Sequence, residues 1–421
     1  MIRFYNGRVL SFVNGTEITN DEVWTDGSSI CYVGPKKAAM PQFEREIDLK
    51  GDLLLPGFKN AHTHSAMTFL RSMADDMPLD RWLNEQVFPR EAKLSPDMLY
   101  VMTKLAIMEY LSSGITSSFD MYFHNDAYVK ANVDAGFRTV ICGALNNFDR
   151  DITALEREYL HFNDCNELIS YRIGFHAEYT TSLERMEYVA SLTHKYKAPM
   201  FVHSSETKGE VQGCIERHGV TPTVLFDRLG MYDYGGGGFH CVYMSEEDID
   251  IFRRRKLCAV LNPASNLKLA SGIAPVTRFL SEGIDLAIGT DGAASNNALD
   301  FFREMYLVTA LAKYREADAS VCDANRVLEM ACVGGAKAMG LTDCDCIATG
   351  KKADMTVINL HRPNMHPLNN ISKNIVYAGS KENVRLTMVN GKVLYENGEF
   401  FIGEDVGKLY AEADKISEAV R

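Results

Sequence analysis

The sequence predicts an α/β protein in which a (β/α)8 TIM-like barrel carries a small β-sandwich domain built from both termini. Two observations lead to this prediction. Eight short apolar segments in the middle of the chain end in polar residues and alternate with stretches of helical spacing, whereas both ends of the chain have a strand-and-turn texture. Strands that alternate with helices pair in parallel through right-handed crossovers. Eight such units over about 250 residues fit a barrel.

The two ends of the chain read as short strands separated by turns. Asn14-Gly15, Asp26-Gly27, Asn390-Gly391 and Asn397-Gly398 are dipeptides typical of hairpins. We expect strands within residues 1–12, 21–26, 28–34, 44–49, 354–360 and 384–401, followed by a polar helix over 405–421. The predicted division is therefore a composite β-sandwich domain of residues 1–55 and 351–421 and a barrel of residues 56–350.

The middle of the chain supplies the barrel. Residues 98–114 and 182–196 have apolar side chains at i, i+3 and i+4, as amphipathic helices do. The alternative is a doubly wound open sheet, but no G-x-G-x-x-G follows the first strand, and the four glycines 235–238 precede a strand. The predicted barrel strands lie within residues 53–64, 114–122, 137–145, 171–179, 198–206, 235–244, 257–266 and 284–294.

Composition excludes several classes of function. The 421 residues are 46% hydrophobic, and the formal net charge is -12, which argues against a nucleic-acid binder or a generic attraction to anionic membranes. No apolar run is long enough for a membrane-spanning helix. The ten cysteines are dispersed and include no C-x-x-C pair, so we expect reduced thiols in a cytoplasmic protein. A homo-oligomer is compatible with the sequence but is not indicated by it.

Histidine placement is the informative feature of the middle segments. His62, His64, His176, His203 and His240 lie near the carboxyl ends of predicted strands, and Asp291 follows the eighth strand. All strands of a parallel barrel end at one face, where active sites form. We therefore expect these residues to converge.

The convergence predicts a metal site. His62 and His64, at i and i+2 on a strand, share a face, although such a pair alone could also be a solvated turn. His203 and Asp291 complete a set of three imidazoles and one carboxylate, which suits one Zn²⁺, or Fe²⁺ by the same donors.

Two further residues could handle protons. Glu206 follows His203 by three residues, where it can lie beside the ligands and act as a general acid or base; the alternative is a glutamate that stabilises a helix start. His240 could bind the ion or orient the water, and we favour the second role. Asp291 would accept a proton from a water whose pKa the ion lowers.

At this point the chain resembles the amidohydrolase superfamily and, within it, the methylthioadenosine/S-adenosylhomocysteine deaminase family. The resemblance covers essentially the whole chain, including 353–360 and 388–395 in the terminal stretches. Its main motifs are PGFKNAHTHSAMTFLR (56–71), FVHSSE (201–206), HCV (240–242), NPASNLKLASGIAPV (262–276) and GTDGAASNN (289–297).

The resemblance implies hydrolytic removal of the 6-amino group from adenosine-type nucleosides: methylthioadenosine, S-adenosylhomocysteine, 5′-deoxyadenosine or adenosine. Activated water attacks the amino-bearing carbon, Glu206 protonates the adjacent ring nitrogen, and ammonia leaves an inosine analogue. The family pattern implies a single ion, because no lysine ends strand four. The metal ligands it implies are His62, His64, His203 and Asp291, with Glu206 and His240 as the proton-handling pair.

The same resemblance implies substrate contacts. Trp82 would pack near the sugar, Glu91 would bind ribose hydroxyls and His176 would hydrogen-bond the purine; the alternatives are a core residue for Trp82 and a solvated charge for Glu91. Relatives that accept S-adenosylhomocysteine have an arginine after strand three, where this chain has Gly143 and no arginine before Arg150. Whether Arg150 contacts substrate is open. We expect neutral 5′ substituents to be preferred, because a carboxylate would lack its bidentate partner.

Two alternatives keep the same fold. One is a deaminase of another aminated heterocycle, guanine or a pterin, or a triazine chlorohydrolase with the same mononuclear site. The other is a non-catalytic scaffold, which the complete set of ligands together with Glu206 disfavours.

Overall fold

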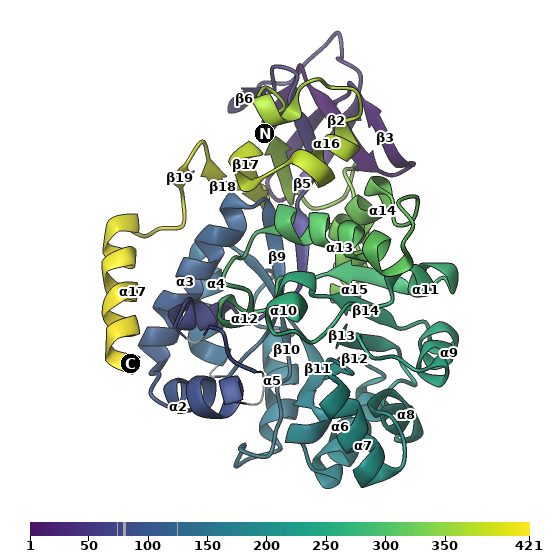
Figure 1. Cartoon of the computed structure of the whole chain (residues 1–421). Coiled ribbons are helices and arrows are strands. Elements are labelled where there is room, and N and C mark those ends of the chain that lie inside the picture. Colours follow the sequence, from purple (N-terminus) through teal and green to yellow (C-terminus); the bar gives the residue numbers. More distant parts are fainter. Residues whose placement is uncertain (74, 79–80, 124) are drawn as a thin grey trace.

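The computed structural model describes residues 1–73, 75–78, 81–123 and 125–421. A barrel surrounded by helices forms the larger part of the molecule, and β-sheets from the two ends of the chain lie beyond one end of the barrel (Figure 1). Within the described residues, no helix has both the length and the apolar character needed to cross a membrane.

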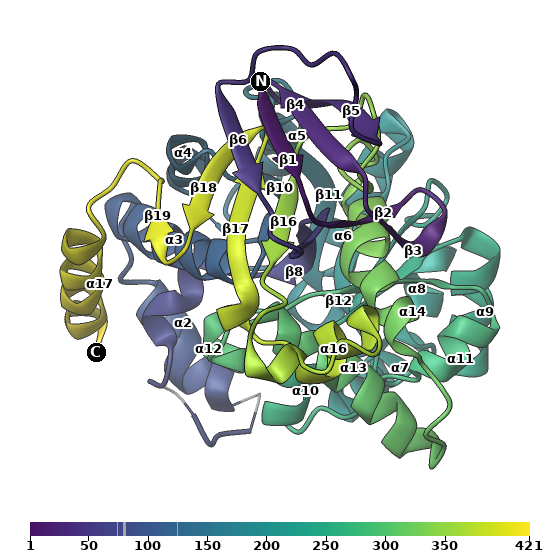
Figure 2. The same cartoon turned by 90° about the horizontal axis from the view of Figure 1, so that it is seen from above.

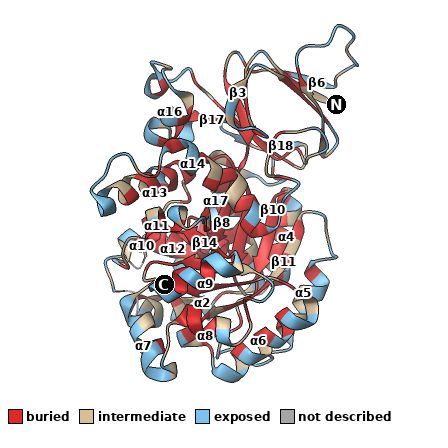
Figure 3. Ribbon diagram, turned by 90° about the vertical axis from the view of Figure 1, so that its right-hand side faces the viewer, coloured by how far each residue is buried: buried red, intermediate tan, exposed pale blue. Residues whose placement is uncertain are grey.

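Eight parallel strands form the barrel in sequence order, so the predicted fold class is confirmed; seven of the predicted segments contain one barrel strand each, and the segment 171–179 overlaps a strand that begins at Ile169. Side chains along these strands are almost all buried (Figure 3). The last strand returns to the first, since the amide of Asp291 donates to the carbonyl oxygen of His62 at 3.0 Å. The strands are β8 (Phe58–Thr63), β9 (Ile115–Met121), β10 (Arg138–Cys142), β11 (Ile169–Ala177), β12 (Met200–Ser204), β13 (Gly236–His240), β14 (Cys258–Leu261) and β15 (Asp285–Ile288).

Helices connect and cover these strands, with exposed residues on their outer faces (Figure 3). The helices predicted over 98–114 and 182–196 correspond to α3 and α6. The α-helices are α2 (Phe88–Glu91), α3 (Pro96–Ser112), α4 (Asn125–Ala135), α5 (Ala154–Phe162), α6 (Leu183–Tyr196), α7 (Lys208–His218), α8 (Pro222–Arg228), α9 (Glu246–Arg255), α10 (Pro263–Lys268), α11 (Val276–Ser281), α12 (Ala293–Asn296), α13 (Phe301–Glu316), α14 (Ala324–Glu329), α15 (Gly335–Met339), α16 (Ile371–Ala378) and α17 (Val406–Val420). Shorter 3₁₀ and π turns span Ser65–Leu70, Trp82–Val87, Glu178–Thr180, Met330–Gly334, Pro363–Met365 and Lys381–Asn383.

The glycine run before His240 has a packing role. A Cβ on Gly237 would lie 2.1 Å from the carbonyl oxygen of Cys258 on β14, and one on Gly236 would lie 1.9 Å from that of Met200 on β12. Side chains at these positions would therefore push the neighbouring strands away from β13. The run lets β13 fit between its neighbours.

Strands from both ends of the chain form two further sheets, which lie side by side in Figure 2. An apolar cluster that includes Phe4, Val23, Leu54, Val357 and Leu386 packs between them. The four-stranded sheet has the order β5 (Ser29–Gly34), β4 (Glu22–Asp26), β1 (Ile2–Tyr5), β6 (Arg45–Asp48). The seven-stranded sheet has the order β19 (Glu399–Phe400), β18 (Lys392–Glu396), β17 (Val384–Val389), β16 (Met355–Ile358), β7 (Leu53–Pro56), β2 (Arg8–Phe12), β3 (Gly15–Thr19).

One predicted segment, 53–64, is two strands rather than one. The chain leaves the seven-stranded sheet after Pro56 and enters the barrel at Phe58. Gly57 makes this passage, and a Cβ there would lie 2.0 Å from the side chain of Thr116, so only a glycine fits without moving β9. The division of the chain at residues 55/56 and 350/351 stays a prediction.

A buried ion pair joins the barrel to the seven-stranded sheet. The Arg138 guanidinium on β10 donates to both carboxylate oxygens of Asp354, at 2.6 and 3.2 Å, and also to Oδ1 of Asn390. The Arg138 and Asp354 side chains are 4% and 0% exposed. Both charges are therefore removed from water, and each depends on the other for compensation.

We expect Arg138→Met to lower the free energy of unfolding by about 3–5 kcal/mol, because it leaves the Asp354 carboxylate buried and unpaired. Urea denaturation followed by circular dichroism measures the change. Arg326→Met is the matched control: it removes an exposed pair with Glu329 and should cost about 0–1 kcal/mol. Equal effects of the two substitutions would contradict this account.

Candidate active site

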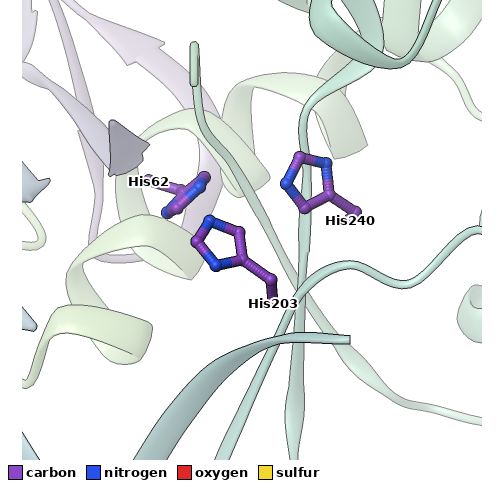
Figure 4. Close-up of side chains that lie close together, drawn as sticks. All are labelled: His62, His203 and His240. Atoms are coloured by element: carbon purple, nitrogen blue, oxygen red, sulfur yellow. The ribbon is translucent and has the colours of Figure 1, made fainter. Parts of the chain in front are cut away.

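Histidines from three barrel strands converge at the carboxyl ends of those strands. The rings of His62 on β8, His203 on β12 and His240 on β13 face one another, with one ring nitrogen of each within 4.8 Å of the others (Figure 4). His62, His64 and Asp291 form a second such group. The Nε2 atoms of His64 and His203 are 3.4 Å apart. The convergence expected from the barrel rule is therefore present.

Backbone carbonyls orient two of the imidazoles. Nδ1 of His64 lies 2.6 Å from the carbonyl oxygen of Met121, and Nδ1 of His203 lies 2.6 Å from that of His176. An Nδ1–H that donates to a carbonyl leaves the Nε2 lone pair available as a ligand. His62 is fully buried, and neither of its ring nitrogens has a hydrogen-bond partner in the described chain.

The Asp291 carboxylate presents one oxygen to the histidines. Its Oδ1 lies 3.2 Å from Nε2 of His64 and 3.5 Å from Nε2 of His62. Its Oδ2 accepts hydrogen bonds from the hydroxyls of Ser265 at 2.6 Å and Ser295 at 2.8 Å. Asp291 has a left-handed backbone, with φ of 57°, which is a sparsely populated conformation of the kind found at functional sites.

The charge states of these groups fit a divalent cation. Burial lowers the pKa of His62 to about 3 and that of His203 well below its usual value, so both rings are neutral. Burial opposes the charged form of His64 as well, but the hydrogen bond with Asp291, the charges of Asp291 and Asp120 and the Met121 carbonyl together outweigh it and raise the pKa of His64 to about 9. Burial also opposes the charged form of Asp291, but the neighbouring rings of His62 and His64 hold the pKa of this carboxyl well below its usual value. His62, His203 and Asp291 thus have the forms that bind metal, whereas a bound cation would have to displace a proton from His64. The two ring nitrogens of His62 are buried and have no hydrogen-bond partner among the described residues, and a bound cation would give one of them a partner.

Glu206 and His240 lie beside this cluster. Nε2 of His240 is 3.8 Å from Oε2 of Glu206, and Nδ1 of His240 donates to Oδ1 of Asn266 at 2.7 Å. The Ser271 hydroxyl donates to Oε1 of Glu206 at 3.1 Å. Burial raises the pKa of Glu206, which favours a carboxyl that carries a proton.

Sequence reasoning missed the outer partners of these groups. Ser265, Asn266, Ser271 and Ser295 lie in the motifs 262–276 and 289–297, but nothing in their spacing assigned them to particular side chains. In the structure Ser265 and Ser295 donate to Asp291, Asn266 accepts from His240, and Ser271 donates to Glu206.

The cluster opens into a cavity of about 690 Å³, lined by most of the residues predicted to contact substrate. Trp82 is 5% exposed, and its Nε1 has no hydrogen-bond partner in the described chain. Oε1 of Glu91 accepts a hydrogen bond from Tyr122 at 2.8 Å, and burial raises its pKa to about 7. Burial lowers the pKa of His176 to about 4, so its ring is neutral. The predicted residues that line the cavity are His64, Trp82, Glu91, His176, His203, Glu206, His240 and Asp291.

Arg150 is not brought to this cavity. It is exposed and is not among the described residues that line the cavity, although its neighbours Asp149 and Asp151 are. Gly143 has no room for a side chain, since a Cβ there would lie 2.4 Å from Leu155 and 2.8 Å from the Gly174 carbonyl oxygen. Neither position offers a cation to a bound substrate.

Comparison with known proteins identifies the family of this chain. The model of the amidohydrolase family matches residues 53–394. The chain belongs to the amidohydrolase family. A 5-methylthioadenosine/S-adenosylhomocysteine deaminase from Moorella thermoacetica is 37% identical over 412 residues, which cover 96% of each chain. A 5′-deoxyadenosine deaminase from Methanothermobacter thermautotrophicus is 39% identical and covers 85% of this chain and 86% of its own.

Solved structures share the fold of this amidohydrolase. An adenosine deaminase from Xanthomonas campestris with bound zinc superposes with a TM-score of 0.94 and 31% identity, covering 100% of this chain and 98% of its own. An atrazine chlorohydrolase from Arthrobacter aurescens has a TM-score of 0.90 and 22% identity, which shows the fold alone. Together with the His-His-Asp cluster, the family supports a divalent metal at this site.

Proposed function

We propose that this amidohydrolase is a metal-dependent deaminase of the 6-amino group of adenosine-type nucleosides, which forms the inosine analogue and ammonia. The observation that carries the proposal is the placement of Glu206 and His240 beside the His-Asp cluster inside one substrate-sized cavity. The names of the relatives support the nucleoside class, because they are deaminases of methylthioadenosine, S-adenosylhomocysteine and 5′-deoxyadenosine.

We propose zinc as the ion, with ferrous iron as the alternative, and His62, His64, His203 and Asp291 as the residues that hold it. Three imidazoles and one carboxylate suit either metal. When bound, such an ion lowers the pKa of a coordinated water from about 16 toward 7 and so supplies a nucleophile at neutral pH.

The side chains around this site divide the proton transfers. Asp291 takes a proton from the attacking water, whose oxygen forms the new bond to the amino-bearing ring carbon. Glu206, held by Ser271, protonates the adjacent ring nitrogen and relieves the charge that develops there. His240, fixed by Asn266, orients the water. Asp291 then passes its proton to the amine and the proton of the new hydroxyl returns to Glu206, so that cleavage of the carbon–nitrogen bond would release ammonia and leave the carbonyl of the inosine analogue.

Substrate contacts are proposed for three cavity residues. His176 offers a neutral ring to the purine, Trp82 packs against the sugar, and Glu91 accepts hydrogen bonds from the ribose hydroxyls. Hydrogen bonds to a charged group are stronger than those between neutral groups. Because burial raises the pKa of Glu91 to about 7, we expect this residue to set the affinity for the sugar above that pH, where its carboxylate is ionised.

At a pH above about 7, where the Glu91 carboxylate is ionised, we expect Glu91→Gln to lower kcat/KM for methylthioadenosine by about 10- to 100-fold, because it weakens a charge-assisted hydrogen bond to the ribose. Steady-state kinetics with the 2′,3′-dideoxy nucleoside are the control, since this substrate cannot make that bond and should lose little. An equal loss with both substrates would remove Glu91 from ribose recognition.

A side-by-side substrate panel tests the proposed function. Adenosine, 5′-deoxyadenosine, methylthioadenosine and S-adenosylhomocysteine are incubated with the zinc-loaded protein, together with guanine, a pterin and atrazine. The expected result is ammonia released from at least one adenosine-type nucleoside, with little ammonia from guanine or the pterin and little chloride from atrazine. Turnover confined to guanine, the pterin or the triazine would instead favour the alternative reaction on the same site. A cytoplasmic location and self-association stay predictions.

A further inference from the structure

One end of the cavity is lined by hydrogen-bond acceptors that the proposed chemistry does not use. We call this end the distal arm and define it by Asn125 on α4, Asp149 after β10, Glu158 on α5 and Tyr171 on β11, all of which line the cavity. Burial raises the pKa of Glu158, and the charges of Asp126 and Asp149 raise it further. Glu158 accepts hydrogen bonds from Asn125 and Tyr171, so these three residues form one group on the cavity wall, and Asp149 adds its charge nearby.

Asn125 is the residue that indicates a ligand here. It is 6% exposed, and its Nδ2 donates to Oε2 of Glu158 at 2.8 Å. Its Oδ1 is buried and has no hydrogen-bond partner among the described residues. A buried amide oxygen without a donor costs free energy. Because Asn125 lines the cavity, a bound molecule with a donor group can supply the missing partner.

The hydrogen bonds that Glu158 accepts show which polar groups of the distal arm are left for a ligand. Tyr171 donates its hydroxyl to the same Oε2 at 3.0 Å, so this hydroxyl and one of the two Nδ2 hydrogens of Asn125 are already used, while Oδ1 of Asn125 stays an acceptor without a partner among the described residues. Asp149 adds a second half-buried carboxylate, whose Oδ2 accepts the amide of Asn146.

The basic side chains near this part of the cavity do not reach its described wall. No lysine or arginine is among the described residues that line it. Arg185 donates to the backbone oxygen of Asp149 but does not line the cavity, and Arg150 is exposed. A carboxylate placed in the distal arm would meet the carboxylates of Glu158 and Asp149 and an amide oxygen, while the nearby charge of Arg185, which acts on Asp149, stays outside the described lining.

We infer that the distal arm, through Asn125, Glu158 and Asp149, selects nucleosides whose 5′ substituent ends in a primary ammonium and rejects those that end in a carboxylate. The inference rests on the proposed function, since it assumes that a nucleoside occupies the cavity with its purine at the metal cluster. An ammonium has three donors and no acceptor. It can satisfy Oδ1 of Asn125 and pair with the carboxylates at the same time.

Three nucleosides of matched length test the inference: 5′-(3-aminopropylthio)-, 5′-(butylthio)- and 5′-(2-carboxyethylthio)-5′-deoxyadenosine. We expect kcat/KM for the amine to exceed that for the alkyl compound by about 10-fold or more, and the carboxylate to fall below it by a similar factor. Equal values, or a preference for the carboxylate, would overturn the inference while leaving the proposed deamination intact. No turnover of any of the three would count against the proposed function instead.

Two variants and a binding measurement keep the test independent of folding and turnover. Glu158→Gln and Asn125→Leu should each reduce the preference for the amine. Asp151→Asn should retain it, because Asp151 also lines the cavity but is exposed and paired with Arg157. Dissociation constants of the three corresponding inosine products, measured by calorimetry, should follow the same order. Equal dissociation constants would overturn the inference without reference to catalysis.

Discussion

Glu206→Gln should lower kcat for methylthioadenosine by about 10²- to 10⁴-fold, the range typical of a lost general acid or base. The amide keeps the size of the side chain and a hydrogen bond with Ser271, but it cannot deliver a proton to the ring nitrogen. Metal content and the dissociation constant of the inosine product should stay near those of the unmodified protein. Steady-state kinetics, metal analysis and calorimetry measure the three quantities.

Glu216→Gln is the matched control for this substitution. It changes the same functional group at an exposed position on α7, where Glu216 accepts a hydrogen bond from Gln212, and it should leave kcat unchanged. If Glu206→Gln retained the full rate, Glu206 would have no role in proton transfer, and another carboxyl would have to protonate the purine.

The second large effect is expected for Asp291→Ala, which removes the carboxylate shared by His62 and His64. Loss of an outer-shell partner typically weakens metal binding about 10- to 100-fold. Loss of Asp291 itself should weaken it by at least about 100-fold and abolish most of the activity. Chelator competition followed by elemental analysis measures the affinity.

Ser265→Ala is the comparison variant, for which we expect a smaller loss of metal affinity. It removes one donor to Oδ2 of Asp291 but keeps Oδ1 directed to the histidines, so its affinity loss should fall within about 10- to 100-fold. If Asp291→Ala and Ser265→Ala had equal metal affinities, the assignment of Asp291 as a ligand would be contradicted.

The barrel could be predicted because strand-length apolar segments alternate with helical spacing, and this local pattern dictates parallel pairing. The same rule predicted that His62, His203 and His240 would meet, since it places strand ends at one face. The change of sheet at Gly57 could not be predicted from the local pattern. Residues 53–64 have the apolar pattern of one strand, but the close contact with Thr116 requires a glycine at the point where the chain passes from one sheet to the other.

Contacts between helices of different units could not be predicted from the sequence. Asn125 and Glu158 lie 33 residues apart on α4 and α5 and meet only through the packing of these helices on the barrel. Arg150 follows Asp149 directly, yet Asp149 lines the cavity and Arg150 is exposed. No periodic pattern distinguishes two adjacent loop residues in this way.

Hydrolytic deamination of a nucleoside is the central claim, and one labelling measurement tests it directly. The zinc-loaded protein is incubated with methylthioadenosine in ¹⁸O-enriched water, and the products are analysed by mass spectrometry alongside an ammonia assay. The account predicts one ammonia per nucleoside consumed and solvent ¹⁸O at the carbon that carried the amino group. Release of free adenine, or an unchanged nucleoside with metal bound, would contradict it.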